Sequence, residues 1–222
     1  MKVAHGEGAR LEDLVGSSAL GERLEEEVQT HLSAVLLGPG RVWKLKKPLD
    51  LGFADFRTLA RRRFFCEEEV RLNRRLATIY EGVDEVRRTP EGDRIGAARG
   101  EVVDYAVRMR RLPADARALA MLERGELRPE HLARLAEKIA AFHEEAEASE
   151  RTAAFGDPAL LGRNAADNFA ACAASSLDLF PAETLERVRR WSEAFLADRE
   201  ALFRARAAGG RIRDVHGDLH LD

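Results

Sequence analysis

The sequence predicts an α+β protein with two lobes: a small antiparallel sheet lobe at residues 1–112 and a mainly helical lobe at residues 113–222. Short β-type runs bounded by turn residues fill much of the first lobe. One long helical stretch, residues 56–78, interrupts them. Beyond Pro113 the apolar residues recur at helical spacing over most of the chain. Strands followed by a run of helices are typical of the α+β class.

Composition excludes several classes of protein. The 222 residues can bury one substantial core or two small ones. A net charge of −3 argues against a nucleic-acid-binding protein, which usually carries a basic stripe. No apolar run approaches membrane-spanning length, and the N-terminus lacks the apolar core of a secretory signal. Cys66 and Cys172 are too few and too far apart for a disulfide framework, so we expect a cytoplasmic protein that binds no membrane.

The first part of the chain predicts a short leader, a helix and a hairpin. Residues 1–9 are polar and loose, and residues 11–28 are mostly helical in pattern. The period then changes, because residues 31–37 and 41–47 are β-type runs. Between them Gly38-Pro39-Gly40 is a strong turn signal, so the two runs are expected to pair as a hairpin.

The second strand of this hairpin carries a candidate phosphate-binding lysine. Alternation places Trp43 and Leu45 on one face, which we expect to be core, and Val42, Lys44 and Lys46 on the other. Only five of the 36 basic residues are lysine, yet three of them fall within four positions here. Because an ammonium and a guanidinium bind phosphate oxygens differently, we interpret the cluster as a sign that one position requires lysine.

The helical stretch at residues 56–78 carries a carboxylate on an apolar stripe. Glu69 shares that stripe with Phe65, Leu72 and Leu76. A carboxylate in such a place is costly without a partner, and Lys44 is the economical one. Glu68 is the alternative. A second interpretation is that residues 67–69 form a charged helix surface that pairs with nearby arginines.

The rest of the chain predicts a second antiparallel pair and then helices. Residues 83–88 and 102–109 are β-type runs with a turn at residues 90–93. Residues 108–112 would connect the lobes before Pro113. The helices are expected at residues 115–124, 128–147, from 157 onward and 184–207, followed by a strand that leads into His216.

The last eleven residues concentrate two histidines and three aspartates. If they form one straight strand, His216, Asp218, His220 and Asp222 share a face and make half of a metal site. If the chain turns after His216, Asp218 heads a loop. A carboxylate there can accept a hydroxyl proton during phosphoryl transfer, with His216 packed beneath it as a brace.

Together these features resemble the aminoglycoside phosphotransferase family, which has a protein-kinase-like fold. The likeness is greatest to kinase-like domains that often precede a P-loop ATPase domain. His216-Gly217-Asp218 is the most specific motif. The resemblance implies a Mg-ATP site between the lobes and transfer of the γ-phosphoryl group to a hydroxyl of a small-molecule acceptor. The supporting stretches are residues 42–48, 50–53, 66–76, 105–113 and 216–222.

The resemblance also implies a role for each candidate residue. Asp218 would be the catalytic base and His216 its brace. Lys44, with Lys46 as the alternative, would bind phosphate and pair with Glu69. Val42 would contact the adenine, whose edge would meet the backbone near Met109 and Arg111.

Two departures from the family pattern limit this interpretation. No Gly-x-Gly-x-x-Gly loop precedes Lys44, and the nearest candidate is Gly38-Pro39-Gly40. The metal-binding asparagine of the signature would follow Asp222, so no metal ligand is assigned and we expect a truncated module with little or no transferase activity. The alternatives are a non-catalytic ATP-binding or interaction module and a metal-dependent hydrolase that uses the residues of the last strand.

Overall fold

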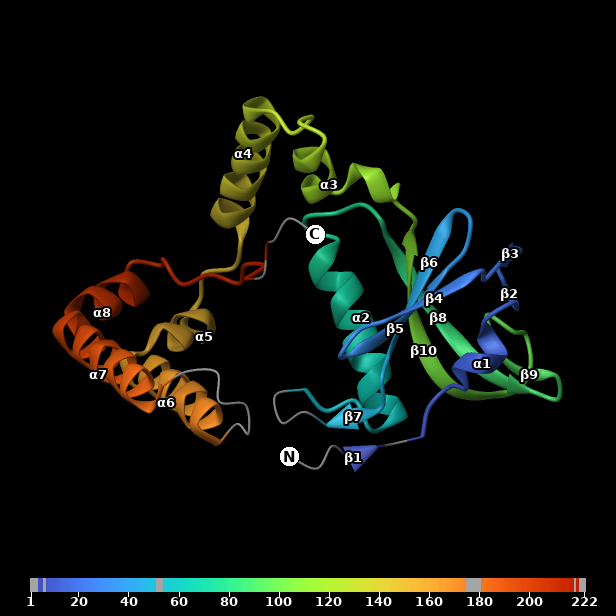
Figure 1. The fold of residues 1–222 in the computed structure, drawn as a ribbon, viewed down its shortest axis with the longest axis horizontal. Coiled ribbons are helices and arrows are strands. Elements are labelled where there is room, and N and C mark those ends of the chain that lie inside the picture. Colours follow the sequence, from blue (N-terminus) through green and yellow to red (C-terminus); the bar gives the residue numbers. More distant parts are fainter. Residues whose placement is uncertain (1–3, 6, 51–53, 175–180, 218, 220–222) are drawn as a thin grey trace. The chain divides into compact units, whose positions relative to one another are not determined.

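The computed structural model describes residues 4, 5, 7–50, 54–174, 181–217 and 219, and it is a mixed α/β structure with a curled antiparallel sheet (Figure 1). The chain divides into two compact units, one that runs through Leu127 and one that spans Arg128–Leu219. Unit 1 therefore includes residues 113–127, which the sequence analysis assigned to the helical lobe. Within the described ranges no helix has the length and apolar character needed to cross a membrane.

Unit 1 is built on a six-stranded sheet in which every neighbouring pair is antiparallel. The strand order is β4-β5-β6-β10-β8-β9. The predicted hairpin is confirmed, because β5 and β6 pair across Gly38–Gly40. The predicted pairing of residues 83–88 with residues 102–109 is also confirmed, although a further strand, β9, follows the intervening turn. The strands are β4 (Glu26–Gln29), β5 (Ser33–Leu37), β6 (Arg41–Lys46), β8 (Tyr80–Thr89), β9 (Gly92–Ile95) and β10 (Glu101–Arg110).

One long helix, α2 (Leu59–Asn73), covers part of one face of the sheet, which we call the inner face (Figure 1). The helix begins where the Thr58 side chain accepts a hydrogen bond from the Arg61 N–H. Cys66 and Val70 of the helix pack on Val107 of β10. The buried side of the helix therefore differs from the predicted stripe by about one residue.

The helix predicted at residues 11–28 is wrong over most of its length. Only α1 (Leu11–Leu14) is helical, and two short strands follow it, β2 (Ser18–Ala19) and β3 (Glu22–Arg23). Gly16 and Gly21 both have a φ of +81°, a left-handed conformation that ends a helix. The glycines outweigh the helical spacing of the apolar residues around them.

The N-terminal segment, residues 8–24, covers the opposite, outer face of the sheet. Leu14, Ala19 and Leu24 from this segment are buried against Trp43 and Leu45. Trp43 and Leu45 are therefore core residues, as predicted. At the beginning of the chain, β1 (Ala4–His5) pairs with β7 (Leu49–Asp50).

The remaining elements are helical. After β10, unit 1 adds a 3₁₀ turn, η1 (Ala114–Ala116), and α3 (Ala118–Glu123). Unit 2 contains α4 (Pro129–Glu145), α5 (Glu150–Ala153), η2 (Ala154–Gly156), α6 (Pro158–Ala174), α7 (Ala182–Asp198) and α8 (Glu200–Ala208).

Two predictions for unit 2 need correction. The single helix expected at residues 184–207 is two helices, because the chain leaves helical geometry at Arg199 (φ −110°, ψ 13°). On α7, Trp191 stacks on Phe195 with ring centroids 5.3 Å apart and stays 65% exposed. The strand expected before His216 is also absent, since residues 211–217 have no regular structure. Asp214 N–H donates to Glu147 O instead of to a neighbouring strand.

Candidate functional site

Two lysines of β6 share one carboxylate of α2. Lys44 Nζ lies 2.9 Å from Glu69 Oε1, and Lys46 Nζ contacts Glu69 Oε2. The predicted contact between Lys44 and Glu69 is therefore present. Glu68 instead pairs with Arg71 at 2.7 Å on the helix surface. Neither contact tests the predicted role of Lys44 in binding phosphate.

The two lysines differ in how far a ligand can reach them. The Lys44 side chain is 31% exposed, whereas that of Lys46 is 11% exposed. Lys46 Nζ also lies 5.6 Å from the centroid of the Phe56 ring, within range of a cation–π interaction. Lys44 is therefore the ammonium that can exchange its protein partner for a ligand, while Lys46 is held between Glu69 and Phe56.

The charge of Glu69 is fixed by these neighbours. Burial alone would raise the pKa of Glu69, but the nearby ammonium groups of Lys46 and Lys44 hold the pKa below its ordinary value. The Asn73 side chain donates to Glu69 O at 2.8 Å and braces the same turn of the helix. Glu69 is consequently an ionised carboxylate at neutral pH, able to keep an ammonium in place.

A pocket of about 790 Å³ lies on the inner face near the beginning of β6. Its apolar lining includes Val28, Leu37 and Val42 from three adjacent strands, and its rim includes Arg111 and Leu112. Val42 and Lys44 project from the same face of β6, two residues apart. Lys44 does not line the pocket but follows Val42, which does, on the same face of the strand, and the pocket has the size of a small-molecule site.

The predicted connector after β10 closes one end of this pocket. Arg111 N–H donates to Gly40 O, and Arg111 Nη1 donates to Gly38 O, both at 2.9 Å. The Met109 side chain packs with Val107 on the inner face. Among the residues that the structure describes, the Leu112 N–H donates to no backbone carbonyl. The available backbone donor at this rim is therefore at Leu112, just beyond the predicted residues Met109 and Arg111.

The turn between β5 and β6 is held by a residue that sequence reasoning missed. Glu22 Oε2 accepts the N–H groups of Gly40 and Arg41 at 2.7 and 3.0 Å. Arg41 Nη1 also donates to Glu22 Oε1 at 2.7 Å. Glu22 comes from a strand predicted as helix, so no local pattern connected it to this turn.

The C-terminal motif is described only in part. His216 and Gly217 are exposed, whereas Asp218, His220 and Asp222 lie outside the described residues. Gly217 has a φ of +75°, so the chain turns there and a straight strand through His216 is excluded. No group of three or more His, Cys, Asp or Glu side chains able to hold a metal occurs in the described ranges.

Two further features were not predicted. Arg62 is buried with Asp104, a pair separated by 42 residues in the chain. The spacing of Arg62, Cys66 and Val70 at i, i+4 and i+8 places Arg62 on the same side of the helix as two apolar residues, and this was the sequence signal for its burial. The Cys66 thiol has its pKa raised to about 12 by burial, so it is not a nucleophile at neutral pH.

Comparison with known proteins finds uncharacterized mycobacterial relatives. Uncharacterized protein Mb2027c of Mycobacterium bovis and uncharacterized protein Rv2004c of Mycobacterium tuberculosis are each 31% identical to the chain over 195 residues. The alignment covers 87% of this chain and 37% of each relative, so the chain spans little more than a third of the relatives' length. No family model matches the sequence. No solved structure matches it either.

Proposed function

We propose that unit 1 binds ATP on the inner face of its sheet. In this proposal the chain is a kinase-like phosphotransferase module, similar to the aminoglycoside phosphotransferases, that transfers the γ-phosphoryl group to a hydroxyl of a small molecule. The observation that carries the proposal is the Lys44–Glu69 pair, with Lys44 two residues beyond Val42, which lines the 790 Å³ pocket.

The connectivity around this pair supports the proposal. In protein kinases the phosphate-binding lysine lies on the third strand and pairs with a glutamate of helix αC. Here β4, β5 and β6 are three successive antiparallel strands, and Lys44 lies on the third. Glu69 lies on α2, the helix of unit 1 that packs against β6, β8 and β10. A surface ion pair formed by chance has no reason to combine this order with a pocket on the same face of β6.

The described residues suit a nucleotide. Val28, Leu37 and Val42 offer apolar surface to a flat base, and the Leu112 N–H can donate to the edge of that base. Lys44 follows Val42 on the same face, where it can bind phosphate oxygens. ATP, when bound, supplies the phosphoryl group. Glu69, which also contacts Lys46, would hold the Lys44 ammonium in place for the phosphates.

The turn between β4 and β5 replaces a glycine-rich loop in this proposal. Residues 30–32 contain no glycine, and the turn is closed by hydrogen bonds between Thr30 Oγ1 and the backbone of Ser33. Lys47 Nζ donates to Thr30 O at 2.5 Å and ties the turn to the end of β6. The phosphates would therefore be covered by a rigid turn rather than by a flexible loop.

The catalytic part of the proposal depends on the His-Gly-Asp motif. Asp218 would accept the proton of the acceptor hydroxyl, and His216 would brace its loop. The described residues offer no cluster for the magnesium ion that accompanies ATP, so the proposal assigns it no ligand. A cytoplasmic location and a downstream P-loop ATPase domain as a partner complete the proposal.

Calorimetric titration with magnesium and the β,γ-imido analogue of ATP tests the binding step. We expect saturable binding by the wild type and at least about tenfold weaker binding by Lys44→Met, because one charge-assisted contact to phosphate is lost. Lys138→Met is the control, since Lys138 is an exposed lysine of α4 and lies outside unit 1. Absence of binding by the wild type at millimolar concentrations, or equal loss in both variants, would contradict the proposal.

A turnover assay separates catalysis from binding. ADP release is measured with a panel of amino alcohols and sugars, and Asp218→Ala is the control. Release that depends on both the acceptor and Asp218 supports the phosphotransferase. Binding without turnover supports the alternative of a non-catalytic ATP-binding module.

A further inference from the structure

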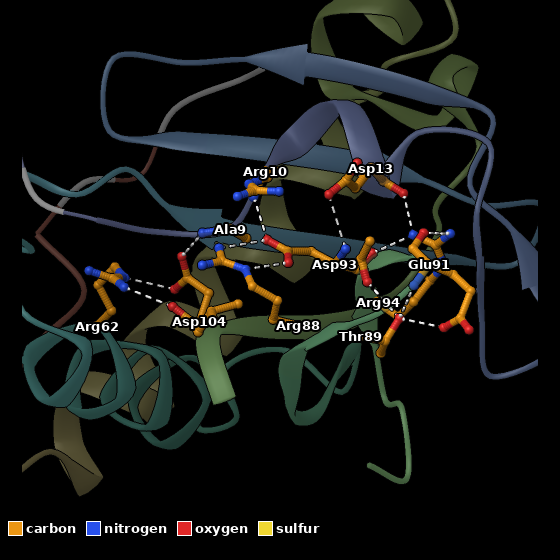
Figure 2. Close-up of polar contacts among 12 residues, drawn as sticks. Ala9, Arg10, Asp13, Arg62, Arg88, Thr89, Glu91, Asp93, Arg94 and Asp104 are labelled. Atoms are coloured by element: carbon orange, nitrogen blue, oxygen red, sulfur yellow. Dashed lines mark hydrogen bonds and ion pairs between the residues drawn. The ribbon is translucent and has the colours of Figure 1, made fainter. Parts of the chain in front are cut away.

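One buried carboxylate connects helix α2 to the N-terminal segment. Asp104 Oδ1 accepts a hydrogen bond from Arg62 Nε at 2.7 Å, and Asp104 Oδ2 accepts one from Ala9 N–H at 3.0 Å (Figure 2). The Arg62 and Asp104 side chains are 1% and 3% exposed. The same aspartate of β10 therefore bonds both to the helix and to the segment on the outer face.

The Arg62 guanidinium also fixes the beginning of α2. Its Nη1 donates to Phe56 O and Arg57 O at 3.1 and 3.0 Å, and its Nη2 donates to Val103 O at 3.1 Å. Both sides of the guanidinium fork are thus used by carbonyl groups of the preceding loop and of β10. A shift of the helix would break several buried hydrogen bonds at once, which is costly.

Strand β10 is adapted locally to present Asp104. The pairing of β10 with β8 is irregular between Val102 and Asp104, as in a β-bulge. Such irregularities redirect a side chain relative to the regular alternation. Asp104 Oδ1 also accepts the Tyr105 N–H at 2.9 Å, which holds the carboxylate in this orientation.

A second buried carboxylate anchors the N-terminal segment. Asp93 Oδ2 accepts the Arg10 N–H at 2.8 Å, and Asp93 Oδ1 accepts from Arg88 Nε at 3.0 Å (Figure 2). The Asp93 N–H donates to Asp13 Oδ2 at 3.1 Å. Together with the burial of Leu14, these bonds hold residues 9–14 across β9 and β10.

Arg62 and Glu69 lie seven residues apart, on the same side of α2. Between them the helix contacts the sheet through Val70, an apolar contact that imposes no direction, and through Cys66, whose Sγ donates a weak hydrogen bond to Tyr105 O at 3.6 Å. The buried, charged hydrogen bonds of the helix with β10 are those of Arg62 with Asp104 and Val103 O, whereas the exposed Arg63 lies over the Tyr105 ring. We propose that Arg62 and Asp104 are positioning residues for the Lys44–Glu69 contact, and that the docked N-terminal segment is required for that role. The consequence for nucleotide binding rests on the proposed function.

Gly8→Ala displaces the segment without removing a charged group. A Cβ at Gly8 would lie 2.9 Å from Asp104 Oδ2 and 3.4 Å from Pro48 Cγ, so the segment must move away from Asp104. We expect faster hydrogen exchange along α2 and about tenfold weaker binding of the β,γ-imido analogue of ATP. Asp104→Asn is expected to act in the same direction.

Ile95→Val is the matched control. Ile95 is buried in the same outer core, on β9, and its shortening lowers stability without touching Asp104 or α2. After correction for its lower stability, the Ile95→Val protein should match the wild type in hydrogen exchange along α2 and in affinity for the β,γ-imido analogue of ATP. If Gly8→Ala behaves like Ile95→Val in both measurements, the segment is only structural and the inference is wrong.

Combination with Glu69→Gln tests the route of the effect. If the segment acts through Glu69, adding Gly8→Ala to Glu69→Gln should cause no further loss of affinity. If the loss of affinity in the double variant equals the product of the losses in the two single variants, the segment acts elsewhere and the inference is overturned.

A nucleotide-independent measurement separates this inference from the proposed function. The folded protein is acylated for increasing times and then digested, and the rate of acylation at Lys44 is read from its peptides by mass spectrometry. Gly8→Ala should raise that rate severalfold, because an Nζ group released from its contact with Glu69 is more accessible to the reagent. If the wild type binds no nucleotide while this rate still rises, the proposed function fails and the positioning role stands. An unchanged rate would refute the positioning role itself.

Discussion

The two faces of the sheet in unit 1 are built from the same strands but have opposite characters. On the outer face Leu36, Trp43 and Val86 are fully buried beneath the N-terminal segment. On the inner face α2 covers only part of the sheet: two lysines of β6 contact Glu69 of that helix, and an open pocket lies near the beginning of β6. The contrast shows how one strand, β6, can contribute to stability with one set of side chains and to a candidate site with the other.

Removing the largest outer-face side chain should have the largest effect. Trp43→Ala is expected to lower the free energy of unfolding by about 3–5 kcal/mol, because it leaves a cavity in the outer core. It also removes the hydrogen bond from Trp43 Nε1 to Asp84 Oδ2 at 2.8 Å. Urea denaturation followed by circular dichroism measures the change. A loss below about 1 kcal/mol would show that the outer face is not the main core.

Glu69→Gln on the inner face should have a smaller, pH-dependent effect. We expect a loss of about 2 kcal/mol near neutral pH, since two charged contacts are removed. The pKa of Glu69 is lowered in the folded state from its ordinary value of 4.5. The stability that its charge contributes is therefore fully present above pH 4.5 and is lost as the pH falls through the lower pKa of the folded state. Urea denaturation of both proteins across this range checks the sign. A difference that grows on acidification would contradict the assignment.

Lys46 and Lys44 should differ in their effects on stability. Lys46→Met is expected to cost about 1–2 kcal/mol, because it leaves one oxygen of the buried Glu69 without its partner. Lys44→Met should cost less, since Lys44 is the more exposed lysine. Lys46→Arg should restore part of the loss by returning the charge. Equal losses for the two methionine variants would remove the distinction between them.

The smallest effect is expected for the neighbouring surface pair. Glu68→Gln should change stability by less than about 0.5 kcal/mol, because the Glu68–Arg71 pair lies on the exposed side of α2. Nucleotide affinity should stay unchanged. A loss comparable to that of Glu69→Gln would mean that the charge of this helix turn matters more than its geometry.

Alternation and local turn chemistry were sufficient to predict the centre of the site. The period of two along β6 separated Trp43 from Lys44, and the need to pair a carboxylate on an apolar stripe connected Glu69 to Lys44. The interpretation failed where glycine conformation competed with helical spacing, at Gly16 and Gly21. Helical spacing with Cys66 and Val70 could have placed Arg62 on the buried side of the helix, but it could not have named Asp104 as the partner, because the two residues are 42 positions apart.

The different environments of the two tryptophans supply an intrinsic spectroscopic label for each compact unit. Trp43 is fully buried in unit 1, whereas Trp191 in unit 2 is largely exposed to water. The indole in the apolar interior should emit at shorter wavelengths than the hydrated one, and aqueous quenchers should reach only the latter. Fluorescence of the unmodified chain can therefore follow the unfolding of the two units separately in one titration.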